Sequence, residues 1–105
     1  MATKQCQKLV FQMVGCEVAI NCRDRLAGQL ILANYDAMQV DRNGNPDLQY
    51  EVRRRRNSSQ FYLAHQGRKP ITAADEGELL FILEKELTIE LQKSAGSSIF
   101  FLRLH

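Results

Sequence analysis

The sequence lacks the short motifs that bind nucleotides and the residue clusters that bind metal ions. Neither GxxxxGK[ST] nor GxGxxG occurs, so the chain has no recognisable loop for a nucleotide phosphate. The cysteines Cys6, Cys16 and Cys22 form no CxxC pair and have no histidine near them, which argues against a zinc site. Their odd number also argues against a disulfide framework. We therefore expect thiols that are buried or have no function, no metal ion and no cofactor.

Long apolar runs are missing as well. No stretch approaches the roughly 18 residues of a transmembrane helix, and no apolar signal core stands at the N-terminus. We therefore expect a cytoplasmic protein without a membrane partner. Of the 105 residues, 45% are hydrophobic and 25% are charged, which is typical of a folded globular protein, and this length suits a single domain over residues 1–105.

The longest element that the sequence predicts is a helix over residues 72–94. Thr72 can cap its first turn, Asp75 can complete a capping box, and Gly96 can end it. One stripe of this helix is apolar and is expected to pack on a sheet; it consists of Leu79, Leu80, Leu83, Leu87 and Leu91, with Ile82 and Ile89 on its flank. Residues 86–91 also alternate with a period of two, so a shorter helix followed by a strand is an alternative.

The remaining elements are short. Alternation predicts strands at 8–14 and 16–21 around a tight turn at Gly15, and further strands at 48–54 and 60–65. Asp24 can cap a helix that runs to about Met38. Its main face is mixed and is flanked by Ile31 and Tyr35; it consists of Leu26, Leu30, Ala33, Asn34 and Ala37. The final run IFFLRLH reads as a strand buried on both faces. Together they predict a two-layer α+β domain, with a mostly antiparallel sheet and two helices on one face.

Four consecutive arginines are the most obvious candidate for contact with an anion or a partner; they are Arg53, Arg54, Arg55 and Arg56. A solvated hairpin end is favoured, because charge at a strand end discourages edge-to-edge pairing of sheets. Nucleic-acid sites usually add stacking aromatic residues and a wider basic face. Phe61 and Tyr62 are spaced as strand residues, so nucleic acid is not an expected partner.

The histidines are His65 and His105, and neither has an acid or a nucleophile near it in the sequence. For His65, a strand-end histidine bonded to backbone or water is favoured over a catalytic base. A small enzyme that pairs His65 with a carboxylate from elsewhere in the fold is a third hypothesis. The carboxylates Glu84, Glu86 and Glu90 are expected to spread over different faces of the long helix and to form a salt-bridged surface rather than a catalytic pair.

Residues 77–105, GELLFILEKELTIELQKSAGSSIFFLRLH, resemble the stretch before the phosphate-binding loop in bacterial HPr-kinase-like proteins, which share a nucleotide-binding core with phosphoenolpyruvate carboxykinase. The matching positions are Leu79, Leu80, Leu83 and Leu87 in the helix, and Leu104 with His105 at the junction to the kinase core. The resemblance implies a noncatalytic N-terminal scaffolding or interaction domain, cut from a longer chain before a P-loop kinase domain. No catalytic residue carries over.

The resemblance also implies partners. These are the C-terminal kinase-like domain of the same protein and further copies of the chain, with Phe81, Phe100 and Phe101 as candidate contacts. Phe81 projects opposite the leucine stripe, so its alternative is an aromatic ring lying over a neighbouring loop. The alternative function is a free-standing protein-binding or nucleic-acid-binding module that uses the basic loop at residues 53–56.

Overall fold

The computed structural model describes residues 7–41, 45–65 and 67–94. These residues form five strands, two α-helices and one short 3-10 helix. In chain order they are β1 (Gln7–Met13), β2 (Cys16–Cys22), α1 (Arg25–Tyr35), η1 (Asp36–Met38), β3 (Leu48–Arg54), β4 (Phe61–His65), β5 (Ile71–Ala73) and α2 (Glu76–Ser94).

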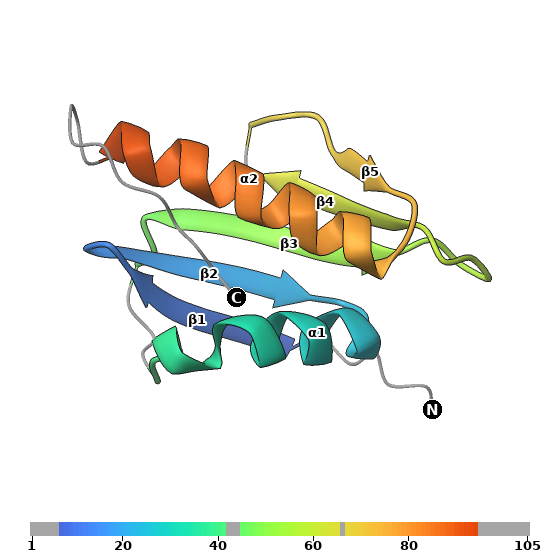
Figure 1. Ribbon diagram of the computed structural model, residues 1–105, viewed down its shortest axis with the longest axis horizontal. Coiled ribbons are helices and arrows are strands. Elements are labelled where there is room, and N and C mark those ends of the chain that lie inside the picture. Colours follow the sequence, from blue (N-terminus) through green and yellow to red (C-terminus); the bar gives the residue numbers. More distant parts are fainter. Residues whose placement is uncertain (1–6, 42–44, 66, 95–105) are drawn as a thin grey trace.

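The five strands make one sheet in the order β1-β2-β3-β4-β5. Neighbouring strands are antiparallel except β2 and β3, which are parallel and are connected through α1. Figure 1 shows α1 and α2 on the same side of this sheet, and both contribute side chains to one core. The predicted two-layer α+β fold, with a mostly antiparallel sheet and two helices on one face, is confirmed.

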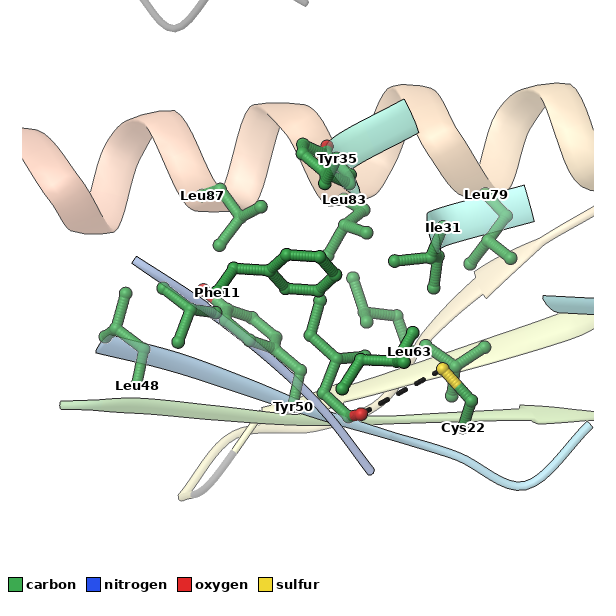
Figure 2. Packing of buried hydrophobic residues seen from close by; sticks show 14 of the residues in the cluster. Phe11, Cys22, Ile31, Tyr35, Leu48, Tyr50, Leu63, Leu79, Leu83 and Leu87 are labelled. Carbon is green, nitrogen blue, oxygen red and sulfur yellow. Dashed lines mark hydrogen bonds between the residues drawn. The ribbon is translucent and has the colours of Figure 1, made fainter. Parts of the chain in front are cut away.

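Strand alternation divides the sheet into a helix-covered face and an opposite face. We call the latter the open face, because its residues on β3, β4 and β5 are exposed or partly exposed, although Val10 and Ala19 of β1 and β2 are buried there. Leu9, Ile20 and Tyr50 lie side by side in register and point towards the helices. Buried strand residues meet the apolar stripe of α2 in Figure 2, where Leu79, Leu83 and Leu87 point from the helix towards the sheet. The buried part of that stripe is Leu79, Leu83, Leu87 and Leu91, each at most 1% exposed, so the predicted leucine face is confirmed as the spine of the core.

The beginning of α2 differs from the prediction. Thr72 lies in β5, opposite Tyr62 of β4, and the helix begins at Glu76. Its first turn is capped by Asp75, whose Oδ1 accepts a hydrogen bond from the Glu78 amide at 2.9 Å. The Glu78 carboxylate in turn accepts one from the Ala74 amide at 2.6 Å. The predicted start at Thr72 was wrong, because pairing with β4 holds residues 71–73 extended.

From Glu76 the helix continues without a break to Ser94, so the alternative of a short helix followed by a strand was also wrong. The alternation of residues 86–91 is compatible with a helix, because Leu87 and Leu91 lie on the same side of a helix, one turn apart. The predicted stop at Gly96, the strand at 99–105, Phe100, Phe101 and Cys6 lie outside the described residues.

The predicted helix after Asp24 is confirmed, since Asp24 Oδ2 accepts from the Ala27 amide at 3.0 Å and helical structure continues through η1 to Met38. Its buried face was predicted wrongly. Ala27, Gly28, Ile31 and Tyr35 face the sheet, whereas Leu30 is only partly buried. The small residues explain the choice: a Cβ on Gly28 would lie 3.5 Å from the Cβ of Cys22, so α1 packs close to β2.

The turn between β1 and β2 consists of Val14 and Gly15, with positive φ angles of 48° and 80°. Two-residue hairpins of this kind favour Asn-Gly, because asparagine and glycine tolerate the left-handed region and a β-branched valine does not. We predict that Val14→Asn raises the free energy of unfolding by about 1 kcal/mol in urea titrations. Val14→Ala is the control, since it removes the branch but keeps the strain. An asparagine variant no more stable than the alanine variant would contradict this account of the turn.

Candidate functional site

The four predicted arginines gather around a hollow of about 340 Å³ at the end of β3. We call it the arginine hollow. It is lined by Arg23, Asp24, Arg53, Arg54, Arg55, Arg56 and Tyr62. Two of these residues, Arg23 and Tyr62, were not among the candidates from the sequence. Arg23 directly follows β2 and Tyr62 lies in β4, and these two strands flank β3 in the sheet.

Backbone pairing explains why these residues meet. The parallel register sets Cys22 of β2 beside Val52 of β3, and the Arg23 amide extends the pairing by donating to the Val52 carbonyl at 2.8 Å. Arg23 therefore lies beside Arg53. On the other side, the antiparallel register sets Tyr62 of β4 directly opposite Arg53. The first contact joins segments that α1 separates in the chain, and the second joins the two strands of a hairpin.

The β3–β4 turn is held in a defined conformation. The Arg55 amide donates to the Gln60 carbonyl at 2.8 Å, and the Arg55 side chain donates from Nη1 to Gln60 Oε1 at 3.1 Å. Asn57 adopts a positive φ of 55°, which asparagine tolerates well. The Gln60 amide donates to Ser58 Oγ at 3.0 Å. The tip of this hairpin thus presents its arginines from an ordered backbone.

Positive charge exceeds negative charge in the arginine hollow. Arg23 pairs with Glu51 at 2.6 Å, Arg53 reaches the same carboxylate at 3.5 Å, and Arg54 pairs with Asp24 at 3.1 Å. Within residues 7–41, 45–65 and 67–94, five guanidinium groups therefore share two carboxylates, so three of their positive charges have no carboxylate partner there. The two pairs of Glu51 are partly exposed and worth at most about 1 kcal/mol each, so an incoming anion can replace them at small cost.

A second hollow adjoins the first on the open face of the sheet. It has a volume of about 480 Å³ and shares Arg53 and Tyr62 with the arginine hollow. We call it the edge hollow, because Pro70 and Thr72 from the β5 region complete its wall together with Ala64 and Glu51. Tyr62 therefore stands between a basic hollow and one with a more apolar lining.

A third feature lies near α2, where Tyr50 and His65 stack with ring centroids 4.5 Å apart. The Tyr50 hydroxyl and His65 Nδ1 are buried and have no hydrogen-bond partner among the residues that the structure describes. Burial raises the pKa of Tyr50, and Glu90 and Glu86 raise it further, against an opposing effect of Arg68. Tyr50 and His65 line a hollow of about 240 Å³ that also includes Arg68 and Glu86.

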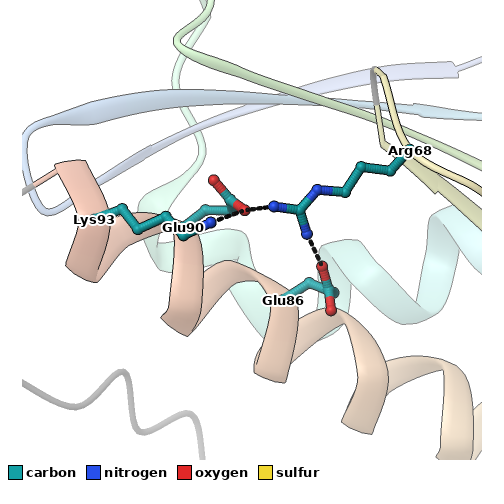
Figure 3. A network of polar contacts seen from close by, with 4 residues as sticks. All are labelled: Arg68, Glu86, Glu90 and Lys93. Carbon is teal, nitrogen blue, oxygen red and sulfur yellow. Dashed lines mark hydrogen bonds and ion pairs between the residues drawn. The ribbon is translucent and has the colours of Figure 1, made fainter.

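Ion pairs, shown in Figure 3, connect the loop before β5 to α2. Arg68 lies 3.2 Å from Glu90 and 3.9 Å from Glu86, and Lys93 lies 3.5 Å from Glu90. Glu86 and Glu90 thus face the same loop, contrary to the expectation that these carboxylates spread apart. His65 and Glu86 line the same hollow, but within residues 7–41, 45–65 and 67–94 no hydrogen bond or ion pair joins His65 to a carboxylate. The network ties the loop to the helix.

Other candidates from the sequence stand apart from the arginine hollow. Phe81 is 66% exposed on the outer side of α2. Cys16 and Cys22 are buried in the core as thiols. In the part of the chain that the structure describes, no three His, Cys, Asp or Glu side chains come together to hold a metal ion. No helix among the same residues is long and apolar enough to cross a membrane.

Comparisons of the chain with protein-family models, with curated proteins and with solved structures found no significant match. The resemblance to HPr-kinase-like proteins therefore stays a prediction. Of the residues that carry it, Leu79, Leu83 and Leu87 are fully buried in this domain's own core. Leu104 and His105 lie outside the described residues. The function has to be argued from the chemistry of the arginine hollow.

Proposed function

We propose that this chain is a noncatalytic binding module that uses the arginine hollow to hold an anionic partner. The observation that carries the proposal is the convergence of Arg23 and Tyr62 with the four-arginine run in one hollow. Guanidinium groups bind phosphate and carboxylate oxygens through paired hydrogen bonds, so several of them around one hollow suit a partner with several negative charges.

The position of β3 in the sheet supports a binding role. Charged residues often protect the edge strands of a sheet from pairing with another molecule. However, β3 is the third of the five strands and is paired on both sides, with β2 and with β4. Edge protection therefore does not explain the arginines at its end. Their mutual repulsion is a cost that binding of an anion would relieve.

We predict that the protein binds inorganic polyphosphate, and that replacing Arg55 and Arg56 with serine weakens binding at least tenfold. These two arginines have no carboxylate partner among the described contacts, so the double variant leaves no unpaired carboxylate in the hollow. The logarithm of the affinity should fall with the logarithm of salt concentration, with a slope smaller by roughly one to two in the variant. Isothermal titration calorimetry at several salt concentrations measures both quantities.

The matched control is the double variant Lys8→Ser with Lys85→Ser. It removes the same charge from two exposed positions on β1 and α2, away from the arginine hollow. The control should bind polyphosphate nearly as tightly as the unaltered protein. Equal losses in both double variants would mean that only net charge matters, and the proposed site would be wrong. If the unaltered protein did not bind polyphosphate, the proposed site would also be wrong.

We also propose, on the resemblance described above, that this module is the N-terminal domain of an HPr-kinase-like protein. The supporting observation is the outer side of α2, where Phe81 is 66% exposed and Ile89 is 38% exposed. Such side chains suit contact with the C-terminal kinase-like domain or with a second copy of the chain. The coding sequence downstream of His105 tests this: a phosphate-binding loop is expected within about thirty residues, and a reading frame without one removes the proposal.

A further inference from the structure

We infer that the anionic partner is a single-stranded nucleic acid, whose phosphates occupy the arginine hollow while a base stacks on Tyr62. The inference rests on the proposed function and names the chemistry of the partner. Its starting point is the position of Tyr62, which lines both the arginine hollow and the edge hollow. A nucleotide likewise joins a charged phosphate to a flat aromatic ring a short distance away.

The edge hollow lies on the open face of the sheet. Phe61 and Leu63 point into the core, so Tyr62 between them points to the opposite side, together with its cross-strand neighbours Arg53 and Thr72. Neither helix covers this face (Figure 1). Tyr62 is partly exposed there, beside Ala64 and Pro70. A partly exposed aromatic ring in an open, rather apolar hollow is a surface on which a base can stack.

A further hollow continues the open face beyond the edge hollow. It has a volume of about 210 Å³ and shares Glu51 and Ala64 with the edge hollow. Asn21 and Gln49 also line it. Amide side chains and carboxylates recognise the hydrogen-bonding edges of bases. The open face therefore carries, in order, a basic hollow, an aromatic and apolar one, and a polar one.

The distribution of charge favours a nucleic acid over an acidic protein segment. Glu51 lines both the edge hollow and the polar hollow beyond it, and it is already paired with Arg23 and Arg53, so these two hollows offer no unpaired positive charge to a carboxylate. An acidic peptide carries carboxylates along its whole length and would leave some of them beside Glu51 without a cation. A nucleic-acid strand can keep its phosphates at the arginine end and lay its bases over the middle. A duplex hides the faces of its bases, so the strand must be single.

The test uses two fluorescently labelled strands with the same number of phosphates, one a short single-stranded RNA and the other with abasic sugars. Fluorescence anisotropy should show that the unaltered protein binds the base-containing strand about five-fold to a hundred-fold more tightly. Tyr62→Leu should abolish the difference between the strands, whereas Tyr62→Phe should retain it. The Arg55→Ser and Arg56→Ser double variant should weaken binding of both strands, because it removes contacts to phosphate. Thermal unfolding confirms that each variant is folded.

The outcomes separate this inference from the proposed function. Equal binding of the two strands, or a difference that survives Tyr62→Leu, overturns stacking on Tyr62 but leaves the anion site intact. Binding of poly-glutamate as tightly as the RNA strand overturns the choice of nucleic acid in favour of an acidic protein. Tighter binding of a duplex of the same sequence overturns the single-stranded geometry. Absence of binding to RNA and to polyphosphate alike overturns both proposals.

Discussion

Leu83→Ala should lower the free energy of unfolding by about 2 to 5 kcal/mol. Leu83 is 0% exposed, and Figure 2 shows it between Leu79 and Leu87 on the side of α2 that faces the strands. Removing its branched end takes apolar surface out of the core and leaves a cavity that the sheet cannot close. Because small domains are stable by only about 5 to 15 kcal/mol, this one change removes a large share of the total. Equilibrium unfolding in urea measures it.

Phe81→Ala on the same helix is the matched control. Phe81 is two positions from Leu83 but is 66% exposed, so its removal should change the free energy of unfolding by no more than about 0.5 kcal/mol. The comparison also bears on the proposed contact with another domain. If Phe81→Ala cost as much as Leu83→Ala, the phenylalanine would be committed to this domain's own packing and could not serve as a docking residue.

The sequence predicts the long elements well, because their signals are local and repeated. Four leucines at helical spacing mark the buried side of α2, and alternation marks β1 and β2 with the turn at Gly15 between them. The capping residue Asp24 marks the beginning of α1. Each of these signals depends only on residues within about one or two turns or a few strand positions.

The features that the sequence did not predict are β5 and the buried face of α1. Both depend on contacts with other elements of the fold and not on a local pattern. β5 has three residues, too few for a visible alternation, and it exists because Ile71 and Ala73 pair with β4. Without that pairing, Thr72 is a reasonable helix cap. The buried face of α1 was missed for a similar reason, since Ala27 and Gly28 are chosen by close approach to the sheet rather than by hydrophobicity.

Some residues of the candidate site could likewise be predicted from the sequence, and others could not. Four of its arginines are consecutive, so the sequence shows them plainly. Arg23 joins them only through the parallel pairing of β2 with β3, and Tyr62 only through the antiparallel pairing of β3 with β4. The arginine run by itself favours a solvated hairpin end. The wider basic face and the aromatic ring that a binding site needs come together only when the sheet forms. Predicting β2 beside β3 would have found Arg23, and the register of the β3–β4 hairpin would have found Tyr62.

High pH should destabilise the protein through its two buried tyrosines. Burial raises the pKa of Tyr35 and of Tyr50, with a further increase from Glu84 at Tyr35 and from Glu90 at Tyr50. An unfolded chain ionises its tyrosines near pH 10, whereas the folded protein keeps these two protonated to higher pH. Their stabilising effect is therefore complete below about pH 10 and is lost as the pH rises above it, by about 1.4 kcal/mol per tyrosine for each pH unit.

For the two tyrosines together, the free energy of unfolding should fall by on the order of 5 kcal/mol between about pH 10 and about pH 12. This loss is comparable with the whole stability of a small domain. Urea titrations at several pH values measure the loss, and tyrosinate absorbance follows ionisation during unfolding. Tyr35→Phe and Tyr50→Phe should each remove about half of it. Since the buried Tyr50 hydroxyl has no hydrogen-bond partner in the described part of the chain, Tyr50→Phe should also raise the free energy of unfolding at neutral pH by about 1 kcal/mol or more. If the variant with both phenylalanines lost as much stability at high pH as the unaltered protein, ionisation of these tyrosines would not be the cause of the loss.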